Sequence, residues 1–285
     1  MYNTMIKKTL LCLLIASTML VGCNNGGTRP DSLFDSPVRD GRQCMLVYGV
    51  EELYPGEGPM GVENCYRIEW PEAGTLKPAA EAELLLRCFY DSAATTLEQA
   101  ADRWLNNTWL YGNEDVKVRK KVVDSLGDME NYNYAKKEST LTYDDNLVTM
   151  LITTETMAAY AAHGLYTVEY VVMDRDTRQI VHLNELVDTA KLGEVIIRAI
   201  EDLDVNKDTR DCMFDEYRTA GRVAVPDNFF IDSTRSVINL VFQQYDITPY
   251  ACGIQTVALP IFWLSKHIPL TPYCKKLFGP GCSID

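Results

Sequence analysis

Histidine is scarce in this chain, and the scarcity limits the chemistry that the chain can carry out. The 285 residues include three histidines, His163, His182 and His267. No two of the nine cysteines form a Cys-x-x-Cys pair, and no cluster of cysteine and histidine has the spacing of a zinc site. The Gly-x-Ser-x-Gly signature of serine hydrolases is also missing. We therefore expect neither a metal nor a cofactor, and no local motif indicates a catalytic nucleophile.

Basic residues are also few. The chain has 27 lysines and arginines against 40 aspartates and glutamates, a formal net charge of −13. A surface of this sign repels nucleic acid and anionic lipid, so we expect no nucleic-acid partner, and it attracts cationic proteins, peptides or ions over a Debye length of about 8 Å. A cationic partner is one interpretation; the other is that the charge only keeps the protein soluble.

The apolar run from Leu10 to Val21 is too short to span a bilayer comfortably, which needs about 20 apolar residues. Lys7 and Lys8 precede it, and Leu20-Val21-Gly22-Cys23 fits a lipoprotein signal-peptidase site. We predict a lipoprotein signal peptide over residues 1–22 and lipidation of Cys23; the alternative is an ordinary secretory peptide with a cysteine at its cleavage site.

Cleavage before Cys23 has two consequences. It removes two lysines and no acids, which leaves 25 basic and 40 acidic residues and a formal charge of −15. The lipid anchor also predicts a location in the cell envelope, on a bacterial membrane (the outer membrane if the cell has one), with the folded domain outside the cytoplasm and the anchor as the only membrane contact.

After Cys23 the sequence changes from a tether to a globular pattern. Residues 23–43 are rich in Gly, Pro, Asn and Asp, which predicts a flexible tether. Residues 44–141 and 142–285 mix strand-like and helix-like patterns, so we predict an α+β fold of antiparallel β-sheets packed with helices, in two closely packed lobes. Helices are expected near 79–90, 97–105 and 192–203, and strands 237–245 and 254–260 are expected to close the sheet. Thr96-x-x-Gln99 predicts a capping box at the start of the second helix, and the third helix has an apolar stripe at helical spacing from Leu192 to Leu203.

Seven cysteines follow Cys23, and an odd number cannot all pair within one chain. Cys274 and Cys282 bracket a segment with Gly-Pro-Gly that can turn back on itself, so they are the first pair expected to form a disulfide. Cys44 and Cys65, each in a strand-like run, come second. Cys88 lies on an apolar helical face, where a buried free thiol is expected.

Three segments resemble a known family. They are "AHG" at residues 162–164, "MDRDTRQIVHLNELV" at 173–187 and "FQQYDITPYACGIQTVALP" at 242–260. Their order is similar to that of the extracytoplasmic domain of RsiV-type anti-sigma factors, which is also found beside peptidoglycan deacetylase domains. The resemblance covers roughly residues 143–270. It implies a folded module outside the cytoplasm, and in the anti-sigma members that module recognises lysozyme.

Two features of the family are missing. Because a cleaved lipoprotein signal is predicted at the N-terminus, we expect no cytoplasmic sigma-binding segment with a membrane span, and no deacetylase motif with metal-binding Asp and His residues is found in these 285 residues. We therefore expect a lipid-anchored binding module that recognises lysozyme, another cationic protein or a cell-wall glycan. The alternative is an envelope enzyme that acts on peptidoglycan or polysaccharide.

The segment "YDITPYACG", residues 245–253, is the best candidate for a binding edge. Pro249 fixes its own backbone, and Gly253 can take a positive φ where the chain re-enters the sheet, so the segment is built as a defined turn. Tyr245 and Tyr250 each offer an apolar ring and one hydroxyl. Tyr245, Asp246, Pro249 and Tyr250, with His163 of the Ala-His-Gly motif, are the candidate ligand-binding residues; the other reading is that they only lock the loop against the core.

Two acidic patterns have structural explanations. Asp144 with Asp145, and Asp174 with Asp176, could serve a glycosidase, but both pairs fall in expected turns, where aspartate is common. The string 204–215 places Asp, Asn and Asp at positions 1, 3 and 5 of an EF-hand loop, yet Thr replaces the required Gly and Asp replaces the final Glu. We expect a loop after a helix there, without calcium.

Overall fold

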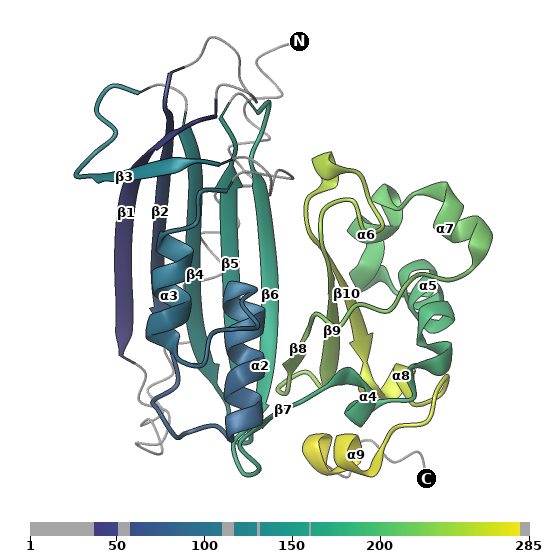
Figure 1. Ribbon diagram of the computed structural model, residues 1–285. Helices are drawn as coiled ribbons and strands as arrows, with labels where there is room; N and C mark the ends of the chain where they lie inside the picture. Colours follow the sequence, from purple (N-terminus) through teal and green to yellow (C-terminus); the bar gives the residue numbers. More distant parts are fainter. Residues whose placement is uncertain (1–36, 51–57, 110–116, 130–131, 160, 280–285) are drawn as a thin grey trace. The chain divides into compact units, whose positions relative to one another are not determined.

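A computed structural model describes residues 37–50, 58–109, 117–129, 132–159 and 161–279 (Figure 1). The predicted signal peptide, the lipidation site Cys23 and Cys282 lie outside these residues. In the described ranges, no helix combines the length and apolar character needed to cross a membrane.

A seven-stranded sheet takes up the first half of the described chain and extends into the second. Its strands follow the order β3-β1-β2-β4-β5-β6-β7. Their bounds are β1 (Val38–Tyr48), β2 (Met60–Glu69), β3 (Arg119–Val123), β4 (Tyr132–Tyr143), β5 (Leu147–Met157), β6 (Leu165–Asp174) and β7 (Gln179–Ile180). All neighbours are antiparallel except β2 and β4, which are parallel.

The parallel pair follows from the helices between its strands, because a parallel connection needs a long crossover. Helices α2 (Pro78–Phe89) and α3 (Leu97–Leu105) supply it and cover one face of the sheet (Figure 1). Both helices match their expected ranges. The predicted cap of α3 is confirmed, since the Thr96 side chain accepts a hydrogen bond from the Gln99 amide at 3.2 Å. Gln99 in turn accepts from the Thr95 amide at 3.1 Å, one residue earlier than a standard capping box.

A second, three-stranded sheet has the order β10-β9-β8. It consists of β8 (Phe229–Asp232), β9 (Val237–Phe242) and β10 (Gln255–Pro260). The last two strands occur where expected, but they pair with each other and with β8 instead of closing the first sheet. The α+β class is confirmed, with two sheets and helices on both.

Helices of the second half pack around the three-stranded sheet. The longest is α5 (Leu192–Asp202), whose apolar stripe was predicted and is buried. It packs against β10 in one continuous apolar core with β9. The other elements are α4 (Leu183–Leu186), η2 (Thr189–Lys191), η3 (Asp204–Asn206), α6 (Lys207–Cys212), α7 (Asp215–Ala220), η4 (Tyr250–Cys252), α8 (Ile261–Leu264) and α9 (Pro272–Phe278).

Two side-chain amides join the sheets at the outer edge of β6. Because β7 pairs with β6 only at Met173 and Asp174, the rest of that edge has no hydrogen-bonded strand among the described residues, although β8 lies close to it. The Asn228 side chain donates to the Val168 carbonyl at 2.6 Å and accepts from the Tyr170 amide at 2.9 Å. The Gln243 side chain donates to the same carbonyl at 2.5 Å and accepts from the Val168 amide at 3.2 Å. These amides take the place of a neighbouring strand.

The observed elements shift two expected boundaries. Strand β1 begins at Val38 and pairs from there with Glu69, so it includes the last six residues of the segment expected to be a tether, 38–43. The expected division between residues 141 and 142 falls at the β4–β5 hairpin. The large sheet therefore takes strands from both expected lobes.

One disulfide lies among the described residues. It joins Cys212 to Cys252, 40 residues apart, with 6.3 Å between the two Cα atoms. In the chain-entropy model a loop of this length is worth about 4 kcal/mol of stability. The pair was not predicted, because its cysteines lie in separate elements with no local signal.

The other cysteine predictions have different outcomes. Cys44 lies opposite Glu63 and Cys65 lies opposite Arg42, so the two cysteines are diagonal neighbours, normally about 7–8 Å apart. That exceeds the usual disulfide span of about 6.8 Å. Both keep separate thiols, which makes the second expected pairing wrong. The buried free thiol of Cys88 is confirmed. The Cys274–Cys282 pairing stays a prediction.

Substituting Asn228 tests the link between the sheets. Asn228→Ala leaves one donor and one acceptor of the β6 edge with fewer partners, so we expect the free energy of unfolding to fall by about 1–3 kcal/mol. Urea unfolding measures the change. Asn146→Ala, at an exposed turn position, is the matched control. Equal stability of the two variants would contradict the role of Asn228.

Candidate functional site

Three aromatic rings from two distant segments lie together beside the start of β6. The rings of His163 and Tyr250 have centroids 4.1 Å apart and planes inclined by 28°. Tyr245 continues the stack, 5.7 Å from Tyr250 at 33°. We call His163, Tyr245 and Tyr250 the aromatic edge. The structure therefore brings together three of the five predicted ligand-binding residues.

A backbone carbonyl holds the two segments together. The Tyr250 hydroxyl donates to the Gly164 carbonyl at 2.9 Å, and His163 Nδ1 lies 3.1 Å from the same oxygen. A Cβ atom on Gly164 would lie 2.7 Å from the Thr156 carbonyl oxygen, so only glycine fits at this position. The glycine of the Ala-His-Gly motif thus permits the close approach of β5 and β6 next to the stack.

The loop before Tyr250 is a tight, strained turn. Tyr245 has φ +72°, a left-handed conformation that is uncommon for any residue except glycine. Gly253 also has φ +72°, as predicted. Two buried side-chain oxygens in this loop, Gln244 Oε1 and Thr248 Oγ1, have no hydrogen-bond partner among the described residues. Strain and unpaired polar groups often gather at functional sites, where the surrounding structure enforces them.

Asp246 and Pro249, the other two predicted binding residues, shape the loop. Asp246 Oδ2 accepts from the Gln243 amide at 2.6 Å, and the Tyr245 amide donates to the Thr248 carbonyl at 3.2 Å. Pro249 is the residue before η4, and its carbonyl accepts from the Cys252 amide at 2.9 Å. Both residues shape the loop that carries the rings, and Asp246 is itself exposed, while Pro249 is half-buried.

Exposed apolar side chains surround the aromatic edge. Tyr245 is 58% exposed, and Leu165 and Tyr166, directly after the Ala-His-Gly motif, are 46% and 41% exposed. Met157, which ends β5, is 41% exposed, and its sulfur lies near Gly164. A cluster of exposed aromatic and apolar side chains on otherwise polar surface marks interaction sites in many proteins.

A groove of about 580 Å³ lies at the N-terminal end of α5. Glu194, Glu216, Tyr217 and Arg222 are among its lining residues. The Tyr217 hydroxyl donates to the Asp246 carbonyl at 2.8 Å, so the groove wall supports the loop of the aromatic edge from behind.

A buried lysine forms a second candidate site, which the sequence analysis missed. Lys137 on β4 has no exposed surface. Its Nζ donates to Thr154 Oγ1 at 2.5 Å and lies 4.6 Å and 5.1 Å from the ring centroids of Trp104 and Tyr90. The adjacent pair Lys136-Lys137 in a strand could have indicated a buried lysine. Neighbouring strand residues point to opposite faces of a sheet, so one of these two lysines has to face the helices.

Charged and titratable groups surround this lysine. Burial lowers the pKa of Lys137, partly offset by nearby Cys88 and Glu169. Burial likewise raises the pKa of Glu169, which lies 3.4 Å from Arg87, and it raises the pKa of the Cys88 thiol to about 12. Such perturbed groups often mark functional sites. Here the ammonium has no exposed surface through which a substrate could reach it, so we assign the cluster a structural role.

In each predicted carboxylate pair, one aspartate accepts hydrogen bonds from the turn next to it. Asp144 Oδ1 accepts from the amides of Asn146 and Leu147 at 2.8 Å and 2.9 Å. Burial alone would raise the pKa of Asp174, but hydrogen bonds from Thr177 and Tyr273 lower it overall. A general acid for glycoside hydrolysis needs the opposite shift.

The other two histidines are part of local structure. His182 caps α4 with Glu185, and its Nε2 lies 3.4 Å from Glu83. The His267 ring stacks on Trp263 with 4.0 Å between centroids.

The EF-hand-like string is helical. Element η3 and helix α6 replace the expected open loop from residue 204 onward. The buried Asn206 side chain donates to the carbonyls of Ala199 and Ala258 and accepts from the Ala258 amide at 2.8 Å. Its amide therefore ties α5 to β10. The part of the chain that the structure describes contains no group of three metal-ligating residues.

Comparisons with known proteins match one part of the chain to a described family. Residues 185–261 match the family described as "Protein of unknown function (DUF3298)". This region contains the Tyr245–Gly253 loop and the disulfide, whereas His163 and all seven strands of the large sheet precede it. No curated protein matches the chain.

Solved structures of DUF3298 proteins are among those that resemble the chain. A member of the DUF3298 family from Bacteroides fragilis NCTC 9343 aligns with a TM-score of 0.53 and 16% identity, over 87% of this chain and 99% of that chain. A DUF3298 family protein from Pseudomonas aeruginosa PAO1 aligns with a TM-score of 0.48 and 15% identity, over 84% and 97%. At this identity the first likeness supports a shared fold and carries no information on ligand.

Lys137 allows a test of the structural role. In the folded protein its pKa lies below the ordinary value of 10.5, so the unfolded chain binds more protons between these two values. Stability should therefore rise with pH in that window. We expect Lys137→Met to remove this rise and Lys137→Ala to destabilise further, because alanine leaves a cavity.

Urea unfolding at a series of values from about pH 7.5 to about pH 10.5 measures the free energy of unfolding across this window. Lys136→Met is the matched control, because this neighbouring lysine lies on the other face of the strand. A hydrogen bond with Glu138 raises the pKa of Lys136, so the stabilisation from this pair is fully present at every pH below the unfolded-state pKa of 10.5. An identical pH response in wild type and Lys137→Met would contradict the assignment.

Proposed function

We propose that the protein is a lipid-anchored binding module of the cell envelope and that the aromatic edge contacts its partner. The observation that carries the proposal is the stack of His163, Tyr250 and Tyr245, whose outer ring is 58% exposed and whose loop is strained. A ring held rigidly in an exposed position loses little entropy on binding, which is how aromatic anchors contribute to affinity.

The chemistry of the surface supports a cationic protein as partner. The mature chain would carry a formal charge of −15, as derived above, which favours encounter with a basic protein, and tyrosine faces attract basic side chains. Together with the resemblance to RsiV-type domains, this points to lysozyme. A cell-wall glycan is the second candidate ligand, because sugar rings also pack on exposed aromatic faces.

An envelope enzyme has less support. Asp144 and Asp145 lie in the β4–β5 turn, whereas Asp174 ends β6 and Asp176 lies in the turn that follows. The pKa of Asp174 is lowered. The histidines are used in a stack on Tyr250, a helix cap and a stack on Trp263. A binding role uses the exposed rings without requiring converging acids.

Tyr245→Gly is the sharpest test of the aromatic edge. Glycine accepts φ +72° without strain, so the variant should be as stable as wild type or more stable by about 1 kcal/mol. Loss of an aromatic anchor should nevertheless weaken binding by about 2 kcal/mol, or roughly thirtyfold. We expect Tyr250→Ala to lose at least as much, but that variant also loses the hydrogen bond to Gly164.

Calorimetric titration of residues 24–285 with egg-white lysozyme and with soluble peptidoglycan fragments measures these losses; this form includes the whole compact unit 36–285. Phe262→Ala is the matched control, since Phe262 on α8 is also 58% exposed. Lysozyme binding should weaken with added salt. If Tyr245→Gly binds like wild type, the loop is only structural; if no ligand binds at low salt, the binding role itself is wrong.

The lipid anchor has its own test. We expect Cys23→Ala to abolish acylation and cleavage at this site, because the modified sulfur and amino group belong to Cys23. Metabolic labelling with a fatty-acid analogue in a bacterial host measures acylation. Labelling that persists in the variant would show that the acylated residue is not Cys23, and unlabelled wild type would show that the chain is not acylated.

A further inference from the structure

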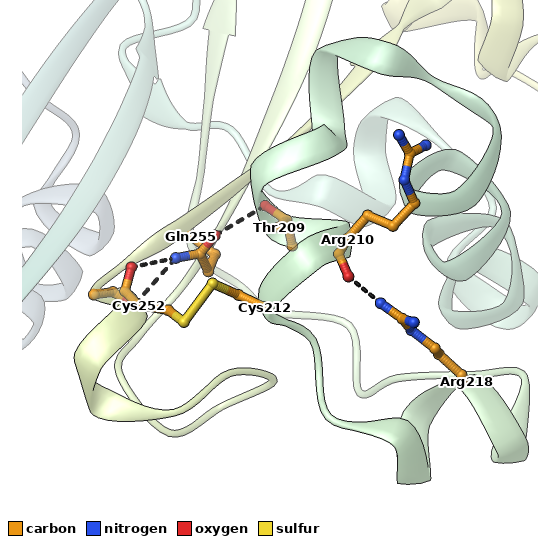
Figure 2. The surroundings of a disulfide bond; sticks show 7 residues. Thr209, Arg210, Cys212, Arg218, Cys252 and Gln255 are labelled. Carbon is orange, nitrogen blue, oxygen red and sulfur yellow. Dashed lines mark hydrogen bonds between the residues drawn. A yellow bond between two sulfur atoms is a disulfide. The ribbon is translucent and has the colours of Figure 1, made fainter.

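The disulfide lies directly behind the aromatic edge. Cys252 is the last residue of η4, the short turn that begins at Tyr250, and Cys212 is the last residue of α6 (Figure 2). The bond therefore ties the turn that carries Tyr250 to a helix outside the loop. Both cysteines are only half-buried, so a small reductant can reach them.

Few other interactions fix this turn from the same side. The Gln255 side chain donates to the carbonyls of Cys252 and Gly253 at 2.6 Å and 3.4 Å and accepts from the Thr209 hydroxyl at 3.1 Å (Figure 2). The Tyr250 side chain is held by the hydrogen bond of its hydroxyl to the Gly164 carbonyl and by its ring contacts, and its backbone carbonyl accepts from the Gly253 amide within the turn. The residues before it include the strained Tyr245 and two buried oxygens without partners among the described residues.

We propose that the Cys212–Cys252 disulfide is a redox control of the aromatic edge: its reduction loosens η4, disorders the ring stack and weakens partner binding. This inference rests on the binding role proposed above. The apolar core of α5, β9 and β10 does not include either cysteine, so the surrounding fold can persist when the bond opens.

The reaction needs a dithiol reductant. Its first thiolate attacks one sulfur of the disulfide and displaces the other cysteine as a thiolate, which takes up a proton. Its second thiol then resolves the mixed disulfide and releases the remaining cysteine. Two electrons pass to the protein, which gains two thiols, and the reductant leaves as a cyclic disulfide.

The three histidines provide a readout that needs no partner. A chain without a tag gives three sets of imidazole C–H signals in NMR spectra, and His163→Gln assigns the set of His163. His163 lies over the Tyr250 ring, so its shifts report the stack, whereas His267 on Trp263 is an internal control on other elements. We expect reduction with dithiothreitol to shift the His163 signals and to leave the His267 signals unchanged. Reoxidation should restore the spectrum of the oxidised protein.

Binding to egg-white lysozyme, measured on the same samples, should weaken at least about tenfold on reduction and recover on reoxidation. The double variant Cys212→Ser/Cys252→Ser should reproduce the reduced state without reductant. Cys282→Ser should behave like oxidised wild type, which separates this disulfide from any bridge made by Cys282. Circular dichroism confirms that each sample is folded, and reversible reduction of wild type remains decisive if the double variant does not fold.

The outcomes separate the two claims. Unchanged His163 signals after complete reduction, verified by thiol counting, would contradict the claim that the disulfide keeps the ring stack ordered. Moved signals with unchanged lysozyme affinity would overturn the control of binding and leave the binding role intact. If oxidised wild type binds no lysozyme, the proposed function fails for this partner, and the redox control of its binding fails with it.

Discussion

The unpaired edge of β6 is the feature on which the rest of the structure depends. A strand at the edge of a sheet exposes amides and carbonyls that need partners when they are covered. Here the partners come from the second half of the chain: Tyr250 bonds the Gly164 carbonyl, Gln243 bonds Val168, and Asn228 bonds Val168 and Tyr170. Backbone groups at Gly164, Val168 and Tyr170 thus receive side chains instead of a strand.

This arrangement explains why the aromatic edge forms where it does. Gln243 lies immediately before the tight loop and Tyr250 lies within it, so bonding to β6 fixes both ends of the segment that carries Tyr245. The same bonds bring it to the Ala-His-Gly motif, where Gly164 leaves no room for a side chain. Loop strain at Tyr245 is then the cost of an exposed, rigid ring.

Local patterns in the sequence predicted the elements better than their partners. The apolar stripe of α5 and the cap of α3 depend on residues a few positions apart, and both were found correctly. Pairings between distant segments have no such signal. The separate second sheet, the parallel β2–β4 pair and the Cys212–Cys252 disulfide all depend on how the chain crosses over in space.

The candidate site shows the same division. The residues of the loop and of the Ala-His-Gly motif were selected as motifs, but their stacking depends on tertiary contacts across more than 80 positions, as the Tyr250–Gly164 bond illustrates. Lys137 was missed because a lysine between polar residues normally indicates exposed surface. Its burial becomes understandable only with the Trp104 and Tyr90 rings in place.

The most direct test of the binding account is a hydrogen–deuterium exchange footprint of the protein with and without egg-white lysozyme. We predict that the partner slows exchange in peptides covering residues 157–167 and 243–253, the two segments that meet at the aromatic edge, and leaves α8 and α9 unchanged. Protection confined to the groove at α5 and α7, or to the β3 edge of the large sheet, would contradict the claim that the aromatic edge is the contact surface.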